Sequence, residues 1–133
     1  MPRILVVDDE PALRRTLERA LHSLNYDVVS VGDPHLVYEL LDAADYDLVM
    51  LDIHLPQMSG DTLAIALLRR WPRLMGRVLL MTGDPWALRA AWPEELRQCP
   101  MLFKPFTLDA LGSAVRTALA AHVPQPQRKR NGG

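Results

Sequence analysis

Five short apolar runs recur along this chain, and they constrain its fold more than any other feature. They occupy residues 4–7, 28–31, 48–53, 78–81 and 101–103. The segment Leu48-Val49-Met50-Leu51 is apolar at every position, whereas a strand with one face in water alternates apolar and polar side chains. This pattern is typical of strands that are buried on both faces of a sheet.

Longer segments between these runs carry apolar residues at every third or fourth position, which predicts amphipathic helices. We expect helices near residues 11–24, over 36–44, over 63–71 and from 107 to about 119. A weaker helix, the fourth in chain order, is predicted to begin at Asp84-Pro85 and to stop before Pro93. A capping residue followed by proline is a common way to begin a helix.

Strands that alternate with helices indicate an α/β fold, in which helices cover both faces of a parallel sheet. Right-handed crossovers then lead to a doubly wound, five-stranded parallel sheet, and we expect the strand order 2-1-3-4-5. In sheets of this kind, ligands bind beyond the carboxyl ends of the strands. The residues that follow each strand are therefore the candidates for function.

Length and charge narrow the class of protein. The 133 residues predict one domain over residues 1–122 and a disordered, proline-rich and basic tail over 123–133. The net charge of −1 favours neither a nucleic-acid partner nor a membrane surface, and no apolar run approaches the ~20 residues of a membrane span. The single cysteine, Cys99, excludes an internal disulfide, fits a cytoplasmic location and is predicted to be a small buried apolar residue.

Acidic, hydroxyl and ammonium side chains stand where four of the predicted strands end. They are Asp8, Asp9, Asp52, Thr82 and Lys104. Two carboxylates about 4 Å apart repel each other by about 4 kcal/mol at an effective dielectric of about 20, so we expect a divalent cation among them. Oxygen donors favour Mg²⁺, which commonly also binds a phosphoryl oxygen. Asp52 could then attack phosphorus and become an acyl phosphate, with Lys104 and Thr82 contacting the phosphoryl oxygens.

Four segments in order carry a family resemblance. They are ILVVDDE at residues 4–10, LVMLD at 48–52 with Pro56 and MSG at 58–60 behind it, LMTG at 80–83, and KPF at 104–106. Each segment closes a predicted strand, and together they resemble the receiver domain of two-component response regulators over about residues 3–122. The resemblance implies the flavodoxin-like form of the fold predicted above.

The resemblance also implies a role for each site residue. Asp52 would be the phosphoacceptor, and Thr82 and Lys104 would contact the phosphoryl group. Mg²⁺ would be bound by the side chains of Asp9 and Asp52, by Asp8 through a water molecule and by the backbone carbonyl of His54. The phosphoryl group would come from a sensor histidine kinase or a phosphotransfer protein. Such a protein catalyses only its own phosphorylation and dephosphorylation and is not otherwise an enzyme.

Output would pass through the fourth helix, the fifth strand and the fifth helix, which family members present to a downstream protein. The same surface is a candidate for homodimer formation. Family members usually carry Tyr or Phe three residues before the lysine, where this chain has Met101, so the relay from Thr82 to the surface is expected to differ. Trp86 and Trp92 lie on or near the fourth helix and are weighed as partner contacts against ordinary packing residues. The resemblance suggests a cis peptide at Lys104-Pro105.

Two other functions compete with the switch. Haloacid-dehalogenase-type phosphatases also use an aspartyl nucleophile and Mg²⁺, but they need a second acid two residues after it, where this chain has His54. A receiver-like module that only binds proteins would not need the complete set of site residues. Two roles are considered for His54. It is either an exposed loop histidine without a function, or it acts together with Asp84 to tune hydrolysis of the acyl phosphate.

Overall fold

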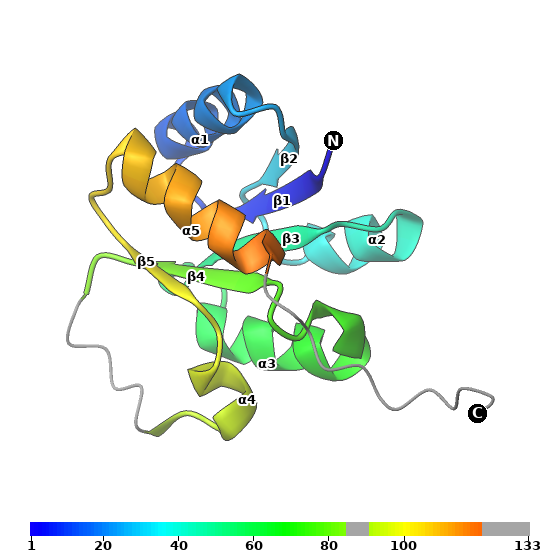
Figure 1. Ribbon diagram of the computed structural model, residues 1–133. Coiled ribbons are helices and arrows are strands. Elements are labelled where there is room, and N and C mark those ends of the chain that lie inside the picture. The colour runs from blue at the N-terminus through cyan, green and yellow to red at the C-terminus, as the bar shows by residue number, and fades with distance from the viewer. Residues whose placement is uncertain (85–90, 121–133) are drawn as a thin grey trace.

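The computed structural model describes residues 1–84 and 91–120. Its elements in chain order are β1 Arg3–Val7, α1 Pro11–Ser23, β2 Asp27–Val31, α2 Leu36–Ala43, β3 Leu48–Asp52, α3 Gly60–Arg70, the short 3₁₀ helix η1 Pro72–Leu74, β4 Val78–Thr82, α4 Glu94–Arg97, β5 Met101–Phe103 and α5 Leu108–Ala120. The strands form one parallel sheet in the order β2-β1-β3-β4-β5 (Figure 1). The predicted fold class and strand order are confirmed.

Helices cover both faces of the sheet. Helices α1 and α5 lie on one face, and α3 and α4 lie on the other (Figure 1). Successive strand residues point to opposite faces, so Ile4 and Val6 pack with α1 and α5, whereas Leu5 and Val7 pack with α2, α3 and α4. Two apolar cores result, one on each side of the sheet, and this explains why the strands are apolar at every position.

The central strands are the most deeply buried. Every residue of β3 and of β4 is buried, including the polar residues Asp52 and Thr82 at their carboxyl ends. The edge strand β2 is only half-buried, and at the other edge the side chain of Phe103 on β5 is 44% exposed. A buried polar side chain is costly unless it is hydrogen-bonded. The buried polar residues at the carboxyl ends of β3 and β4 therefore need partners inside the protein.

The described residues contain a helix after Pro93 that the sequence did not predict. Helix α4 begins at Glu94, immediately after Pro93, where the sequence predicted the helix to stop. Pro93 has φ −59° and precedes two acidic residues in the first turn, so the proline begins a helix instead of ending one. The predicted start of the helix after Asp84, together with Trp86, lies at residues 85–90, outside the described part of the chain.

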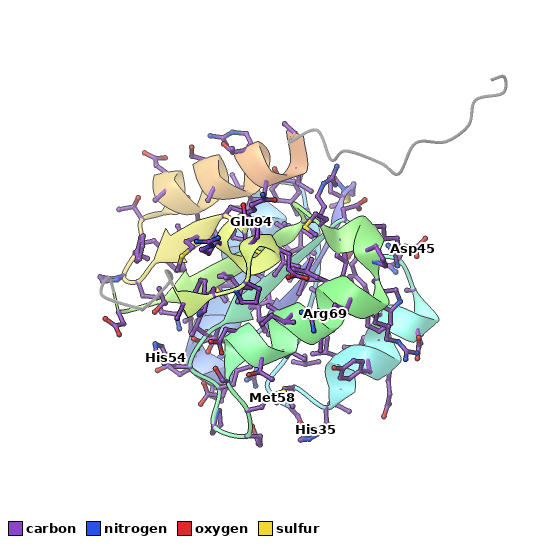
Figure 2. All side chains as sticks on the ribbon, turned by 90° about the horizontal axis from the view of Figure 1, so that it is seen from below. His35, Asp45, His54, Met58, Arg69 and Glu94 are labelled. Atoms are coloured by element: carbon purple, nitrogen blue, oxygen red, sulfur yellow. The ribbon has the colours of Figure 1, made fainter. Side chains whose placement is uncertain are left out.

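Helix α4 packs against α3 (Figure 2). The indole Nε1 of Trp92 donates a hydrogen bond of 3.1 Å to Asp61 at the start of α3, and Arg69 forms an ion pair of 3.6 Å with Glu95. Trp92 is therefore at least partly a packing residue. Cys99 is buried in the same core, as predicted.

The carboxyl ends of the strands form one end of the molecule. His35, His54 and Met58, which all follow strands, lie at this end, and Asp45, which precedes β3, lies at the other (Figure 2). Within residues 1–84 and 91–120, no helix is long and apolar enough to cross a membrane. The predicted tail at 123–133 falls outside the described residues.

Candidate metal centre

The parallel register brings distant residues to one edge of the sheet. Val7 at the end of β1 pairs with Leu51, so that Asp8 follows β1 next to Asp52. On the other side of β3, Asp52 pairs with Met81, the residue before Thr82. Lys104 follows β5, and its backbone N–H donates a hydrogen bond of 2.8 Å to the carbonyl oxygen of Thr82.

Three carboxylates gather at this edge. Asp8 is fully buried, Asp52 is 4% exposed and Asp9 is exposed. One carboxylate oxygen from each lies within 4.8 Å of the other two. Hard oxygen donors at this spacing fit Mg²⁺, which binds through one or two carboxylates and keeps several waters. The exposed Asp9 leaves one side of the cluster open to solvent, so a hydrated ion has an entry path.

Lys104 supplies the positive charge of the site. Its Nζ lies 3.0 Å from Oδ2 of Asp8 and 3.1 Å from Oδ2 of Asp52. The Lys104-Pro105 peptide is cis, as the resemblance suggested. The side chain is 21% exposed, so the ammonium closes the site on one side while it stays within reach of solvent.

Backbone amides hold the second oxygen of each buried carboxylate. The N–H of Glu10 donates to Oδ1 of Asp8, and the N–H of His54 donates to Oδ1 of Asp52, both at 2.9 Å. In each case the donor lies two residues beyond the aspartate, which is the geometry of an Asx turn. Each carboxylate is thus fixed between an amide and the Lys104 ammonium, which orients it before any ligand arrives.

Burial and charge act in opposite directions on the two ionisable groups that face each other. Burial raises the pKa of Asp52 above its ordinary value, and the hydrogen bonds from His54 and Lys104 oppose this shift without cancelling it. For Lys104, burial alone would lower the pKa, but the bonds to Asp8 and Asp52 outweigh it and the pKa is raised. Lys104 therefore stays charged, and it favours the ionised form of Asp52.

Thr82 completes the set of predicted residues at the site. It is fully buried, and its Oγ1 accepts a hydrogen bond of 3.0 Å from the backbone N–H of Asp84. The imidazole Nε2 of His54 lies 3.3 Å from the same oxygen. Glycine at position 83 leaves open space beside the hydroxyl, since an added Cβ would meet only the Cβ of Lys104 at 3.9 Å.

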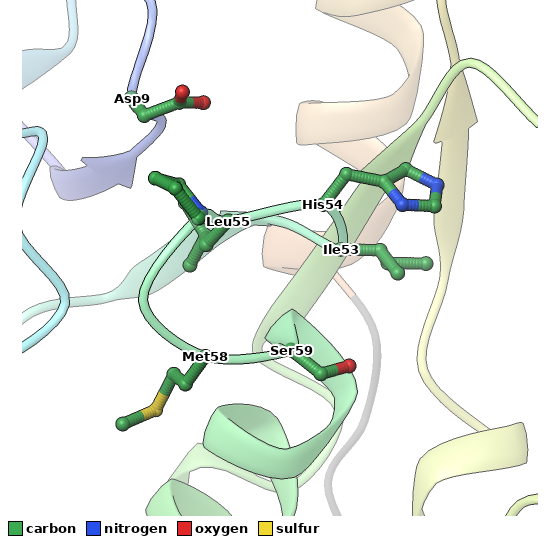
Figure 3. Close-up of a pocket in the computed structure, with 7 residues that line it drawn as sticks. Asp9, Ile53, His54, Leu55, Met58 and Ser59 are labelled. Atoms are coloured by element: carbon green, nitrogen blue, oxygen red, sulfur yellow. The ribbon is translucent and has the colours of Figure 1, made fainter.

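A hollow of about 390 Å³ opens beside the carboxylates. It is lined by Asp9, Ile53, His54, Leu55, Pro56, Met58 and Ser59 (Figure 3). No α-helix begins in this loop until Gly60, so Asp52 does not cap a helix. The loop bends back tightly, with the N–H of Gly60 bonded to the carbonyl of Ile53 at 2.7 Å.

Comparison with known proteins agrees with this geometry. Residues 4–116 match the model of the response regulator receiver domain family. The chain belongs to this family. It is 35% identical to the transcriptional regulatory protein TcrA of Mycobacterium tuberculosis over 94% of this chain and 48% of TcrA, and 32% identical to the response regulator receiver protein CpdR of Brucella abortus over 91% of this chain and 99% of CpdR.

A solved receiver-type structure shows the same fold. The response regulator protein TrrA of Thermotoga maritima, solved in complex with Mg²⁺ and BeF, superimposes with a TM-score of 0.77 at 28% identity over 89% of this chain and 99% of TrrA. The receiver domain spans about half the length of TcrA, whereas it matches CpdR and TrrA over almost their full length.

The side chains of Asp8, Asp9, Asp52 and Lys104 meet at one edge of the sheet. Thr82 lies at the same edge, where its backbone carbonyl bonds to the N–H of Lys104. Three further features of this edge were not predicted from the sequence. The first is the contact of the His54 imidazole with Thr82. The second is the hydrogen bond of 2.7 Å from Arg14 to the carbonyl of Asp8.

The third feature is the steric demand at Gly60, where a Cβ would lie 2.1 Å from the carbonyl oxygen of Asp52. Gly60 ends the MSG segment that follows β3. A glycine at the start of a helix was the sequence signal that could have predicted this close backbone approach. Neither the histidine contact nor the arginine contact follows from spacing alone.

Proposed function

We propose that this receiver domain is a phosphorylation-controlled switch that accepts a phosphoryl group on Asp52 from a sensor histidine kinase or a phosphotransfer protein. The observation that supports it is the position of the buried Asp52 carboxylate. It lies between the Lys104 ammonium, 3.1 Å away, and the exposed Asp9 at an open hollow. A nucleophile, a cation and an approach route are thus present together.

The chemical step exchanges one bond to phosphorus for another. A carboxylate oxygen of Asp52 bonds to phosphorus while the P–N bond of the donor phosphohistidine breaks, and the electron pair of that bond leaves with the imidazole nitrogen. In dephosphorylation a water oxygen bonds to phosphorus while the bond from phosphorus to Asp52 breaks, so that inorganic phosphate leaves and the carboxylate is restored. The N–H of His54 and the ammonium of Lys104 stabilise the charged form of Asp52 that starts and ends this cycle.

The residues that would hold Mg²⁺ are Asp9 and Asp52 through their carboxylates, Asp8 through a water molecule and His54 through its backbone carbonyl. The three carboxylates are hard oxygen donors at a suitable spacing, which supports this assignment. When bound, the ion would offset the charge that builds up on the transferring phosphoryl oxygens. Lys104 and Thr82 would bind those oxygens from the protein side.

Output is proposed to pass through α4, β5 and α5 to a downstream protein, with a homodimer as a further option. Phe103 on β5 is exposed, so this surface offers an aromatic side chain to a partner, and aromatic residues are enriched at protein interfaces. Met101, at the position where the family usually has an aromatic ring, packs against the core beside α3 and α4. A flexible methionine can repack, so the path from Thr82 to this surface does not require an aromatic ring.

The domain is proposed to act in the cytoplasm and to turn over no outside substrate. His54 stands where an aspartyl phosphatase needs its second acid, and its imidazole contacts Thr82 and is turned away from Asp9 (Figure 3). A free, buried Cys99 suits a reducing compartment. Incubation with phosphate monoesters and Mg²⁺ is expected to release no phosphate catalytically, and sustained turnover would favour the phosphatase instead.

The direct test uses acetyl phosphate or beryllofluoride with Mg²⁺. We expect a mass increase of one phosphoryl group with acetyl phosphate, and saturable binding of beryllofluoride, each abolished in Asp52→Asn. The oligomeric state is measured in the same samples to test the homodimer. A wild-type protein that gains no mass and binds no beryllofluoride would leave only the protein-binding module. Lifetimes of the acyl phosphate in His54→Ala and Asp84→Ala test whether these residues tune its hydrolysis.

A further inference from the structure

His54 touches the site through two different groups. Its backbone N–H donates to Oδ1 of Asp52 at 2.9 Å, and its imidazole Nε2 lies 3.3 Å from Oγ1 of Thr82. The ring lies on the side of the loop away from Asp9 (Figure 3). The backbone of His54 therefore bonds to the proposed phosphoacceptor. Its side chain contacts the hydroxyl that is proposed to bind the phosphoryl group.

The neighbours of the Thr82 hydroxyl limit where its proton can be donated. A threonine hydroxyl has one proton to donate and two lone pairs. The N–H of Asp84 occupies one lone pair at 3.0 Å, and this donor cannot also receive the hydroxyl proton. Among the described residues, the neighbour placed to accept that proton is the Nε2 of His54. A neutral imidazole offers an acceptor at this nitrogen when its proton is on Nδ1.

We propose that His54 is a positioning residue that holds the Thr82 hydroxyl in its resting orientation, so that a phosphoryl group on Asp52 must compete with the imidazole for the hydroxyl proton. This inference rests on the proposed function. One hydroxyl cannot donate to both acceptors, because it carries a single proton. The contact between His54 and Thr82 thus stabilises the resting state and is lost in the active state. It shifts the equilibrium toward the resting state.

The size of this bias follows from the exposure of the two partners. Thr82 is fully buried, whereas the side chain of His54 lies at the surface. When the bond breaks, the imidazole can bond to water and the hydroxyl gains the phosphoryl oxygen, so neither group is left unsatisfied. The net value of one such hydrogen bond corresponds to about a fivefold change in affinity.

The test is a double-mutant cycle with beryllofluoride and Mg²⁺ as the probe. Affinities are measured for the wild type, His54→Leu, Thr82→Ala and the double variant. Leucine removes the acceptor and leaves the backbone N–H that holds Asp52. We expect His54→Leu to bind about fivefold more tightly than the wild type, and we expect the same change to have no effect in the Thr82→Ala background.

A conservative variant separates positioning from general structure. His54→Gln offers an amide oxygen as acceptor, and we expect it to bring the affinity back toward that of the wild type. The ¹⁵N shift of Nε2 is also expected to change on beryllofluoride binding in the wild type, since the imidazole loses the hydroxyl.

The outcomes are distinguishable from failure of the proposed function. If the wild type binds no beryllofluoride, the switch itself is wrong and this inference fails with it. If the wild type binds but His54→Leu binds equally or more weakly, the competition is refuted. An effect of His54→Leu that persists unchanged in the Thr82→Ala background would also refute it, because the imidazole would then act by another route.

Discussion

Removal of the Lys104 ammonium should expose the repulsion that it offsets. Lys104→Met leaves a side chain of similar length without charge, while Asp8 and Asp52 stay buried with carboxylate oxygens within 4.8 Å of each other. Two unit charges no farther apart than this repel by at least about 3 kcal/mol at an effective dielectric of about 20. Loss of one partner from a buried ion pair costs a similar amount, about 3–5 kcal/mol. We therefore expect the free energy of unfolding to fall by about 3 kcal/mol in metal-free buffer at neutral pH.

The pH dependence of that loss has a definite sign. Burial already raises the pKa of Asp52 in the wild type, and removal of Lys104 raises it further. A carboxyl whose folded pKa lies above its unfolded value destabilises the fold at high pH, because the unfolded state releases the proton more readily. The loss in free energy of unfolding caused by Lys104→Met should therefore be present at neutral pH. It should become smaller as the pH falls through the folded pKa of Asp52.

Urea denaturation with EDTA, followed by circular dichroism, measures the effect. Adding Asp52→Asn to Lys104→Met should recover most of the lost stability, because the repulsion then disappears, and Mg²⁺ should recover part of it in the single variant. Arg73→Met is the matched control, since it breaks an ion pair of 2.9 Å with Asp45 at the surface and should cost at most about 0.5 kcal/mol. If Lys104→Met costs no more than this control, or if Asp52→Asn does not rescue it, the proposed charge balance is wrong.

Three further predictions follow from single contacts. Gly60→Ala places a Cβ 2.1 Å from the carbonyl oxygen of Asp52, so we expect about 1–3 kcal/mol of destabilisation and weaker beryllofluoride binding. Gly83→Ala, with its nearest contact at 3.9 Å, should avoid this clash, and equal losses in both would contradict the steric argument. Burial raises the pKa of the Cys99 thiol to about 11, so a thiol reagent at pH 8 should react with it only in urea; fast labelling of the native protein would show that it is accessible. Asp9→Asn removes the exposed carboxylate of the cluster. We expect it to weaken Mg²⁺ binding, measured by thermal shift, at least about tenfold, which is the smallest loss typical even of changes to the partners of metal ligands; an unchanged affinity would move the metal site elsewhere.

The sequence predicted the framework well because its signals are local and periodic. The runs at β3 and β4 are apolar at almost every position, and that pattern already indicates burial on both faces. The helices with long apolar stripes, α1 and α5, begin and end within a few residues of their predicted bounds. Short elements fared worse. Helix α4, at Glu94–Arg97, has a single turn, which is too short for an apolar period to predict it.

What the sequence determined by itself is which residues stand at the ends of strands. A parallel sheet puts all those ends on one edge, and this is why Asp8, Asp52 and Lys104 could be grouped from their positions in the chain. Tertiary structure alone decided how they pair. Lys104 bonds to Asp8, which lies 96 positions before it in the chain, and to Asp52, which lies 52 positions before it. His54 contacts Thr82 across a separation of 28 positions. Contacts over such separations depend on strand register and on the bend of the loop after β3, which are set by how the two cores pack.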